Sequence, residues 1–134
     1  MTTMRTLYCT IGICLWLAAC GGDGGGSPPE IQTLTLAATT NPMGNDEAIH
    51  GVFEFEDPDG DAASIAFEVL LPDGTLEALP PQTMDSLEHL KRGTVSFSLT
   101  YSRDTMGRYE VTVWLLDAQG LESNRLTGTI YSRM

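Results

Sequence analysis

From residue 31 onward, apolar and polar residues alternate with a period of two. This is the period of a β-strand that buries one face against a core and leaves the other face polar. A helix would instead repeat its apolar residues every three or four positions. The alternation predicts three inward-facing rows: Val95, Phe97, Leu99 and Tyr101; Tyr109, Val111, Val113 and Leu115; and Ile65, Phe67 and Val69.

Turn sequences divide this pattern into short strands. Asp57-Pro58-Asp59-Gly60, Pro72-Asp73-Gly74 and Asp117-Ala118-Gln119-Gly120 are of this type. About seven strands in about 100 residues indicate an all-β fold, a sandwich of two sheets. The predicted strands span 31–38, 49–56, 63–71, 75–79, 94–101, 107–117 and 124–131.

One segment departs from the period of two. Asp85-Ser86-Leu87-Glu88 has the spacing of a capping box, and Gly93 is suited to ending a helix. We therefore expect a short helical turn near 85–92. Its apolar side chains, which would pack on the sandwich, are those of Met84, Leu87 and Leu90.

Residues 1–19 have the three parts of a secretory signal. Arg5 gives a positive start, the run 7–17 is mostly apolar, and two alanines precede Cys20. The apolar run is shorter than the roughly 20 residues that a membrane-spanning helix requires. The sequence therefore predicts a leader that is removed during export.

The end of this leader, Leu17-Ala18-Ala19-Cys20, resembles the lipobox of bacterial lipoproteins. The resemblance covers residues 1–20 and implies that the Cys20 thiol receives a lipid and that the leader is cut before it. Two or more acyl chains, such as palmitate, give lasting attachment to a membrane. Gly21 follows Cys20, which by the same resemblance favours the outer membrane. An ordinary secretory signal with a chance cysteine is the alternative.

Residues 20–30 combine the lipidated cysteine with a Gly- and Pro-rich tether, which reads GGDGGGSPPE after Cys20. Such a linker has an r.m.s. reach of roughly 15–20 Å. Residues 31–134 then form one domain. Its stability must come from its core, because Cys9 and Cys14 leave with the leader and no disulfide remains.

The chain is strongly acidic, with 7 basic and 18 acidic residues. Loss of Arg5 with the leader changes the formal net charge from −11 to −12. This charge argues against nucleic acid as a partner and against docking on anionic lipid head groups. It is compatible with cation binding or with a basic partner, and equally with acidic side chains that are simply solvated.

The run Gly107-Arg108-Tyr109-Glu110-Val111-Thr112-Val113, followed by Asp117-Ala118-Gln119-Gly120-Leu121-Glu122-Ser123, resembles the last strands of bacterial immunoglobulin-like domains. These include the PKD, cadherin-like and fibronectin type III groups. The run Phe53-Glu54-Phe55-Glu56-Asp57-Pro58-Asp59-Gly60-Asp61 resembles the acidic first half of the same domains. The resemblance spans roughly residues 31–131 and implies a tyrosine corner at Tyr109. It implies little about function, because this architecture serves many unrelated functions.

The first candidate site is an acidic turn, in which Asp57, Asp59 and Asp61 place three carboxylates within five residues. In an immunoglobulin-like sandwich, Asp117 from the turn between the last two strands reaches the same end. Ca²⁺ prefers six to eight oxygen ligands, so the four residues form a candidate calcium site. The alternative is a solvated turn in which Asp117 only caps its own turn.

The second candidate site is an outer face on one sheet. Trp114 and Leu116 alternate away from the Tyr109 row, and Ala66 and Leu70 do the same on the strand near 63–71. Together they would form an apolar patch for a partner. Alternatively, the stem of Arg125 or the helical turn covers them.

No catalytic motif stands out around the two histidines, His50 and His89, and we expect no enzyme. The function that follows is a lipid-anchored, non-enzymatic envelope protein that binds a protein or glycan partner near the membrane. One alternative is an assembly accessory that acts by strand addition at an exposed sheet edge, for instance at 31–38. A small hydrolase is a remote alternative.

Overall fold

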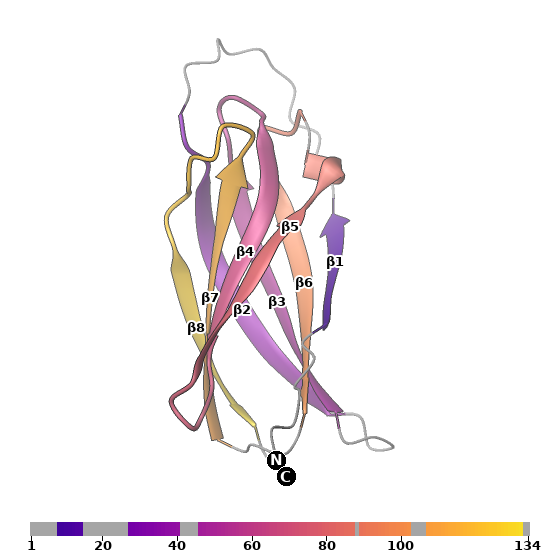
Figure 1. Ribbon diagram of the computed structural model, residues 1–134. Helices are drawn as coiled ribbons and strands as arrows, with labels where there is room; N and C mark the ends of the chain where they lie inside the picture. Colours follow the sequence, from indigo (N-terminus) through magenta and orange to yellow (C-terminus); the bar gives the residue numbers. More distant parts are fainter. Residues whose placement is uncertain (1–7, 15–26, 41–45, 88, 103–106, 133–134) are drawn as a thin grey trace.

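The computed structural model describes residues 8–14, 27–40, 46–87, 89–102 and 107–132. These residues form two antiparallel four-stranded sheets that pack face to face (Figure 1). The predicted fold class, an all-β sandwich of two sheets, is confirmed. The strands are β1 (Tyr8–Cys14), β2 (Glu30–Thr40), β3 (Asp46–Glu56), β4 (Ala62–Leu70), β5 (Leu76–Thr83), β6 (Arg92–Ser102), β7 (Gly107–Asp117) and β8 (Leu126–Ser132).

The first sheet has the strand order β1-β6-β3-β2 and the second has the order β5-β4-β7-β8. Strands β2 to β8 correspond to the seven predicted strands. In immunoglobulin terms, β2, β3 and β6 stand where strands A, B and E stand, and β4, β7 and β8 where C, F and G stand. This order places the turn after β3 and the turn after β7 at the same end of the sandwich.

The core lies between the sheets and is built from the predicted inward rows. Val95, Phe97 and Leu99 are buried, as are the rows that begin at Tyr109 and Ile65. Tyr101, predicted to continue the first row, lies outside the residues whose side chains are described. The ring of Phe97 packs against that of Phe67 at an interplanar angle of 56°, with centroids 4.8 Å apart. It also lies over Gly51, where an added Cβ would come within 2.1 Å of the ring.

The sandwich is closed on one side where β2 meets β8. The pairing of β2 with β3 shifts register between Gln32 and Thr35, and Thr33 adopts a positive φ of 59°. Beside this bulge, the side chain of Asn124 forms the main-chain hydrogen bonds of Ile31 that a neighbouring strand would otherwise form. Asn124 Oδ1 accepts the Ile31 N–H over 2.8 Å, and Asn124 Nδ2 donates to the Ile31 carbonyl oxygen over 2.9 Å. The edge at 31–38 is therefore partly covered.

The predicted helical turn is present but short. It is a 3₁₀ helix, η1 (Asp85–Leu87), and Glu88 of the expected capping box lies outside the described residues. Met84 and Leu87 are buried in the core and Leu90 packs against it, as predicted. None of the described residues form a helix of the length and apolarity needed to cross a bilayer.

Strand β1 has no counterpart among the predicted strands. It lies within residues 1–19, the predicted leader, and pairs antiparallel with β6 from Tyr8 opposite Thr100 to Cys14 opposite Thr94. A β-branched and apolar run of this kind suits a strand as well as it suits a leader. The segment that the sequence predicts to leave thus occupies the edge of the first sheet in the full chain.

Candidate metal centre

The turn between β3 and β4 is organised by the buried carboxylate of Asp57. Its Oδ1 accepts the N–H of Asp59 over 3.2 Å, and its Oδ2 accepts the N–H of Asp61 over 2.8 Å. Its carbonyl oxygen accepts the N–H of Gly60 over 3.0 Å. Gly60 has a positive φ of 65°, a conformation that glycine adopts at little cost. The turn is therefore held rigidly around one acidic side chain.

The turn between β7 and β8 repeats this design. Asp117 Oδ1 accepts the N–H groups of Gln119 over 2.9 Å and Leu121 over 2.8 Å. The Asp117 carbonyl oxygen accepts the N–H of Gly120 over 3.0 Å, and Gly120 has a positive φ of 84°. Asp117 thus caps its own turn, as the solvated-turn alternative expected. Only one of its two carboxylate oxygens serves this purpose.

The two turns are joined directly. The N–H of Ala118 donates to the carbonyl oxygen of Asp61 over 2.9 Å, and Asp117 is paired with Ala62 in the ladder between β7 and β4. We call residues 57–61 and 117–121 together the acidic end. The structure therefore brings Asp117 beside the acidic turn, as the sequence-based topology predicted.

Two further segments border the acidic end. The N–H of Ser27 donates to Asp59 Oδ2 over 2.6 Å, and the N–H of His89 donates to the carbonyl oxygen of Gly60 over 2.9 Å. A surface hollow opens beside them, lined in part by Asp59, Asp61, Asp85 and His89. Of the four candidate carboxylates, those of Asp59 and Asp61 border this hollow.

Two carboxylate oxygens at the acidic end are buried and lack a hydrogen-bond partner among the described residues. They are Asp61 Oδ1 and Asp117 Oδ2. Asp117 as a whole is only 4% exposed. Buried polar atoms in folded proteins nearly always have a partner, and a missing one indicates water or an ion. This signal cannot be read from sequence, because it depends on which oxygen each turn already uses.

The electrostatics of the cluster are unfavourable without a cation. Burial, followed by the negative charges of Asp57, Asp117 and Asp59, raises the pKa of Asp61 from 3.8 to about 6. A hydrogen bond between the side chains of Asp61 and Asp57 acts in the same direction. Asp61 therefore loses its proton at a higher pH than an ordinary aspartate, and a bound cation would favour its ionised form.

The spacing of the oxygens fits a large divalent cation. Asp57, Asp59 and Asp61 each offer one carboxylate oxygen, and these atoms all lie within 4.8 Å of one another. Ligands of Ca²⁺ lie at about 2.3–2.6 Å, so two of them are separated by at most about 5 Å. Glu56, which the sequence placed nearby, is instead exposed on β3 opposite Arg92.

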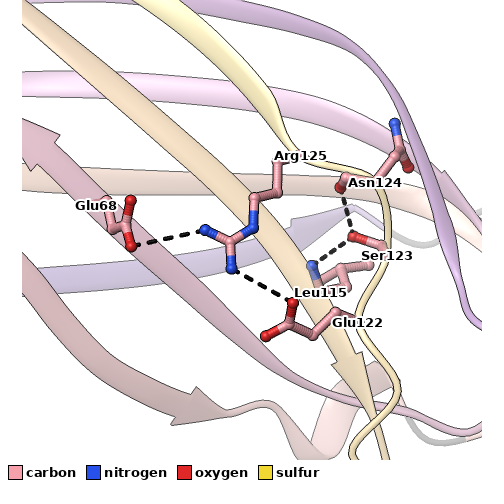
Figure 2. Close-up of polar contacts among 6 residues, drawn as sticks. All are labelled: Glu68, Leu115, Glu122, Ser123, Asn124 and Arg125. Carbon is pink, nitrogen blue, oxygen red and sulfur yellow. Dashed lines mark hydrogen bonds and ion pairs between the residues drawn. The ribbon is translucent and has the colours of Figure 1, made fainter.

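The predicted outer patch is largely covered. Trp114 lies opposite Ala66 on the neighbouring strand and is 8% exposed. The guanidinium of Arg125 lies 3.8 Å from the centroid of its ring. Figure 2 shows Arg125 between Glu68, at 3.6 Å, and Glu122, at 3.3 Å.

The other two members of the patch are not opposite Trp114 in the strand ladder. Leu116 is opposite Ser64, and Leu70 is opposite Glu110. Both are half-buried. The structure therefore brings Trp114 and Ala66 together and covers them with Arg125, which was one of the two alternatives read from the sequence.

The sequence analysis did not identify the polar residues between the acidic end and β8. Ser123 Oγ accepts the N–H of Leu115 over 2.8 Å and donates to the carbonyl oxygen of Asn124 over 2.8 Å (Figure 2). These bonds fix the segment that leads from the acidic end into β8. As for the histidines, His50 Nε2 lies 2.8 Å from Thr39 Oγ1, on the opposite sheet from Asp117.

No protein-family model, curated protein sequence or solved structure matches this chain.

Proposed function

We propose that this chain is a lipid-anchored, non-enzymatic module of the bacterial envelope whose acidic end binds Ca²⁺ and, through it, a protein or glycan partner. The main support for a bound cation is the pair of buried carboxylate oxygens without hydrogen-bond partners, Asp61 Oδ1 and Asp117 Oδ2. The resemblance of Leu17-Ala18-Ala19-Cys20 to a lipobox supports the anchor. Cys20 itself lies outside the described residues.

Charge and coordination both favour a cation here. Four carboxylates at one end repel one another, and a divalent ion neutralises half of that charge. Asp57, Asp59 and Asp61 supply three ligands if each binds through one oxygen, and Asp117 of the neighbouring turn would supply a fourth, whereas Ca²⁺ takes six to eight. The open positions would be filled by water or by oxygens of a partner, such as glycan hydroxyl groups.

The tether leads to this same end of the molecule. Ser27 contacts Asp59, and Ser27 lies seven positions after Cys20. A fully extended segment of this length spans at most about 25 Å. An acyl group on Cys20 would therefore keep the acidic end within that distance of the bilayer, where a partner in the envelope could reach it.

Thermal unfolding with and without calcium tests the site. Millimolar CaCl₂, compared with a chelator, should raise the melting temperature of the mature protein by several degrees, since a ligand at about 100 times its Kd adds about 2.7 kcal/mol. Asp117→Asn should abolish the rise. Asp73→Asn, at the opposite end of the sandwich, should leave it intact. An unchanged melting temperature in the wild type would rule out the calcium site.

Mass spectrometry of the purified product tests the anchor separately. The expected mass is that of a chain that begins at Cys20 and carries diacylglycerol and acyl groups. Cys20→Ser should remove the lipid and leave the protein in the aqueous fraction or as unprocessed precursor. A wild-type chain without lipid would overturn the anchor, whatever the calcium titration shows.

A further inference from the structure

The edge of β6 is covered only by β1 in the described residues. The two strands pair without a break in register over Tyr8–Cys14 and residues 94–100. This inference rests on the proposed processing, because β1 lies within the leader. When residues 1–19 are removed, the outer main-chain groups of β6 lose their partner and the first sheet ends at an open strand.

This edge lacks the features that protect the edges of natural sheets. Between Thr94 and Thr100 β6 has no charged residue and no proline, and its pairing with β3 continues without a register shift. Charged residues, prolines and bulges are the usual protection against edge-to-edge pairing. An edge without them is suited to accept a strand.

The other described edges are protected. Strand β5 contains Pro80 and Pro81, and its pairing with β4 is interrupted between Ile65 and Phe67. Strand β2 carries the bulge near Thr33 and is tied to Asn124. Strand β8 is approached by β2, whose Leu36 side chain lies against Gly128. Protection is therefore missing at the one edge that the leader covers.

The sequence of β6 is complementary to itself in the antiparallel direction. It reads Thr94-Val95-Ser96-Phe97-Ser98-Leu99-Thr100, so the class of side chain is the same in both directions around Phe97. An antiparallel pair centred on Phe97 places Val95 opposite Leu99 and Ser96 opposite Ser98 of the other copy. Apolar pairs and hydroxyl pairs of this kind stabilise neighbouring strands.

We propose that the mature protein forms a two-fold symmetric dimer in which β6 of one copy pairs antiparallel with β6 of a second copy. Removal of the leader leaves a three-stranded sheet, β6-β3-β2, in each copy. In the dimer, the two sheets would form one continuous six-stranded sheet. An isologous contact of this kind closes on itself and does not grow into a fibre. It explains how an edge without protective residues is tolerated.

Charge favours this arrangement over a parallel one. Antiparallel pairing places the two acidic ends at opposite ends of the dimer, roughly the length of β6 apart, which is about 36 Å for 11 residues. That distance exceeds the Debye length of about 8 Å at physiological ionic strength, so the acidic ends repel each other little. The tethers, which emerge beside the acidic ends, would let the dimer lie along the bilayer.

The experiment uses the full chain, expressed with its own leader in a bacterium and purified in mild detergent. Light scattering should give the mass of a dimer for the mature protein. Ser98→Lys places a charge on the polar face of β6 and should lower the dimer fraction at least about tenfold, whereas Thr129→Lys on β8 should not. An unchanged far-ultraviolet spectrum would show that Ser98→Lys still folds.

Cysteine pairing tests the register. Because Cys20 is acylated, each introduced cysteine would be the only free thiol of the mature chain. Co-expressed Ser96→Cys and Ser98→Cys variants should form a disulfide-linked or short-linker-crosslinked dimer more efficiently than either variant alone. Co-expressed Thr127→Cys and Thr129→Cys variants on β8 serve as the matched control and should not crosslink.

Each failure has a distinct meaning. A lipidated, leader-free protein that is monomeric would overturn the dimer and leave the anchor intact. Crosslinking of Ser98→Cys to a different protein would also overturn it, in favour of strand addition to that partner. Retention of residues 1–19 in the wild type would leave β1 available to cover β6, and would overturn both the proposed processing and the dimer.

Discussion

The main-chain N–H of Ala118 donates to the carbonyl oxygen of Asp61 over 2.9 Å, which joins the turn after β7 to the turn after β3. Each turn uses the carboxylate of its first aspartate to hold its own backbone. What remains between them are two oxygens, on Asp61 and Asp117, that the backbone does not use. The backbone of the acidic end is therefore fixed by hydrogen bonds, while two of its carboxylate oxygens have no partner among the described residues.

Neutralising either of these residues should stabilise the calcium-free protein. Asp61→Asn and Asp117→Asn each remove a negative charge from a buried, crowded position, and the new amide can donate to the remaining carboxylate. In the presence of a chelator near neutral pH, we expect both variants to melt at a higher temperature than the wild type. Both should lose the increase caused by calcium. Variants that melt lower and still respond to calcium would contradict the site.

The pH dependence of stability follows from Asp61. Its pKa is about 6 in the folded chain against an ordinary value of 3.8, so between these values the folded chain holds a proton that the unfolded chain has released. Raising the pH through this window therefore favours unfolding. One pKa unit corresponds to about 1.4 kcal/mol, and solvent screens a partly exposed carboxylate, so without calcium we expect a loss on the order of 1 kcal/mol.

Urea unfolding at about pH 4.5 and about pH 7.5 measures this effect. Other carboxyl groups titrate in the same range, so the relevant quantity is the difference between the wild type and Asp61→Asn. The wild type should lose more stability than the variant as the pH rises. Equal losses in the two proteins would show that Asp61 titrates normally.

Much of the fold follows from the period of two. The rows through Val95, Tyr109 and Ile65 identified three core strands, because a strand buried on one face must alternate. The predicted helical turn proved to be only Asp85–Leu87. Strand β1 was missed because its residues suit both a leader and a strand, and sequence periodicity does not distinguish the two.

Asn124→Ala should destabilise the sandwich where β2 meets β8. The substitution removes the partners of both the N–H and the carbonyl oxygen of Ile31, a residue that is 1% exposed. An unsatisfied buried polar group costs about 1–3 kcal/mol, so we expect a loss of about 2 kcal/mol or more in urea unfolding.

Asn124→Asp is the matched variant, because it keeps the acceptor for the Ile31 N–H and loses the donor to its carbonyl oxygen. Its stability should lie between those of the wild type and Asn124→Ala. If Asn124→Ala unfolded at the wild-type urea concentration, the bonds to Ile31 would make no net contribution.

Arg125 should control the environment of Trp114. Removal of residues 1–19, as proposed above, would leave Trp114 as the sole tryptophan, because the other one is Trp16. Arg125→Ala removes the cation that covers the ring, so the fluorescence maximum should move to longer wavelength and acrylamide should quench it more strongly. Arg125→Lys should have a smaller effect.

Arg108→Ala, near the start of the strand that also carries Trp114, is the control and should leave the Trp114 spectrum unchanged. Light scattering of the Arg125 variants would show whether the Trp114 surface, once uncovered, causes the protein to self-associate. If Arg125→Ala left the spectrum unaltered, other side chains would be sufficient to cover the ring.

The candidate site was predictable only in part. The topology of a sandwich brings the turns of Asp57 and Asp117 to one end, so their proximity followed from the strand count and the turn sequences. The unpaired oxygens, the cover of Arg125 over Trp114 and the bonds between Asn124 and Ile31 did not. These depend on side-chain directions and on contacts between residues as far as 93 positions apart, for which a single sequence carries no signal.

Main-chain hydrogen bonds clamp the carboxylates of Asp57 and Asp117, and this has a consequence for ion selectivity. Mg²⁺ demands a near-ideal octahedron with oxygens at about 2.0–2.1 Å, whereas Ca²⁺ accepts a looser shell at about 2.3–2.6 Å. Clamped oxygens cannot draw inward around the smaller ion without breaking the turns that hold them. The stiffness of the loops, more than the number of acidic groups, would then decide which metal the protein retains.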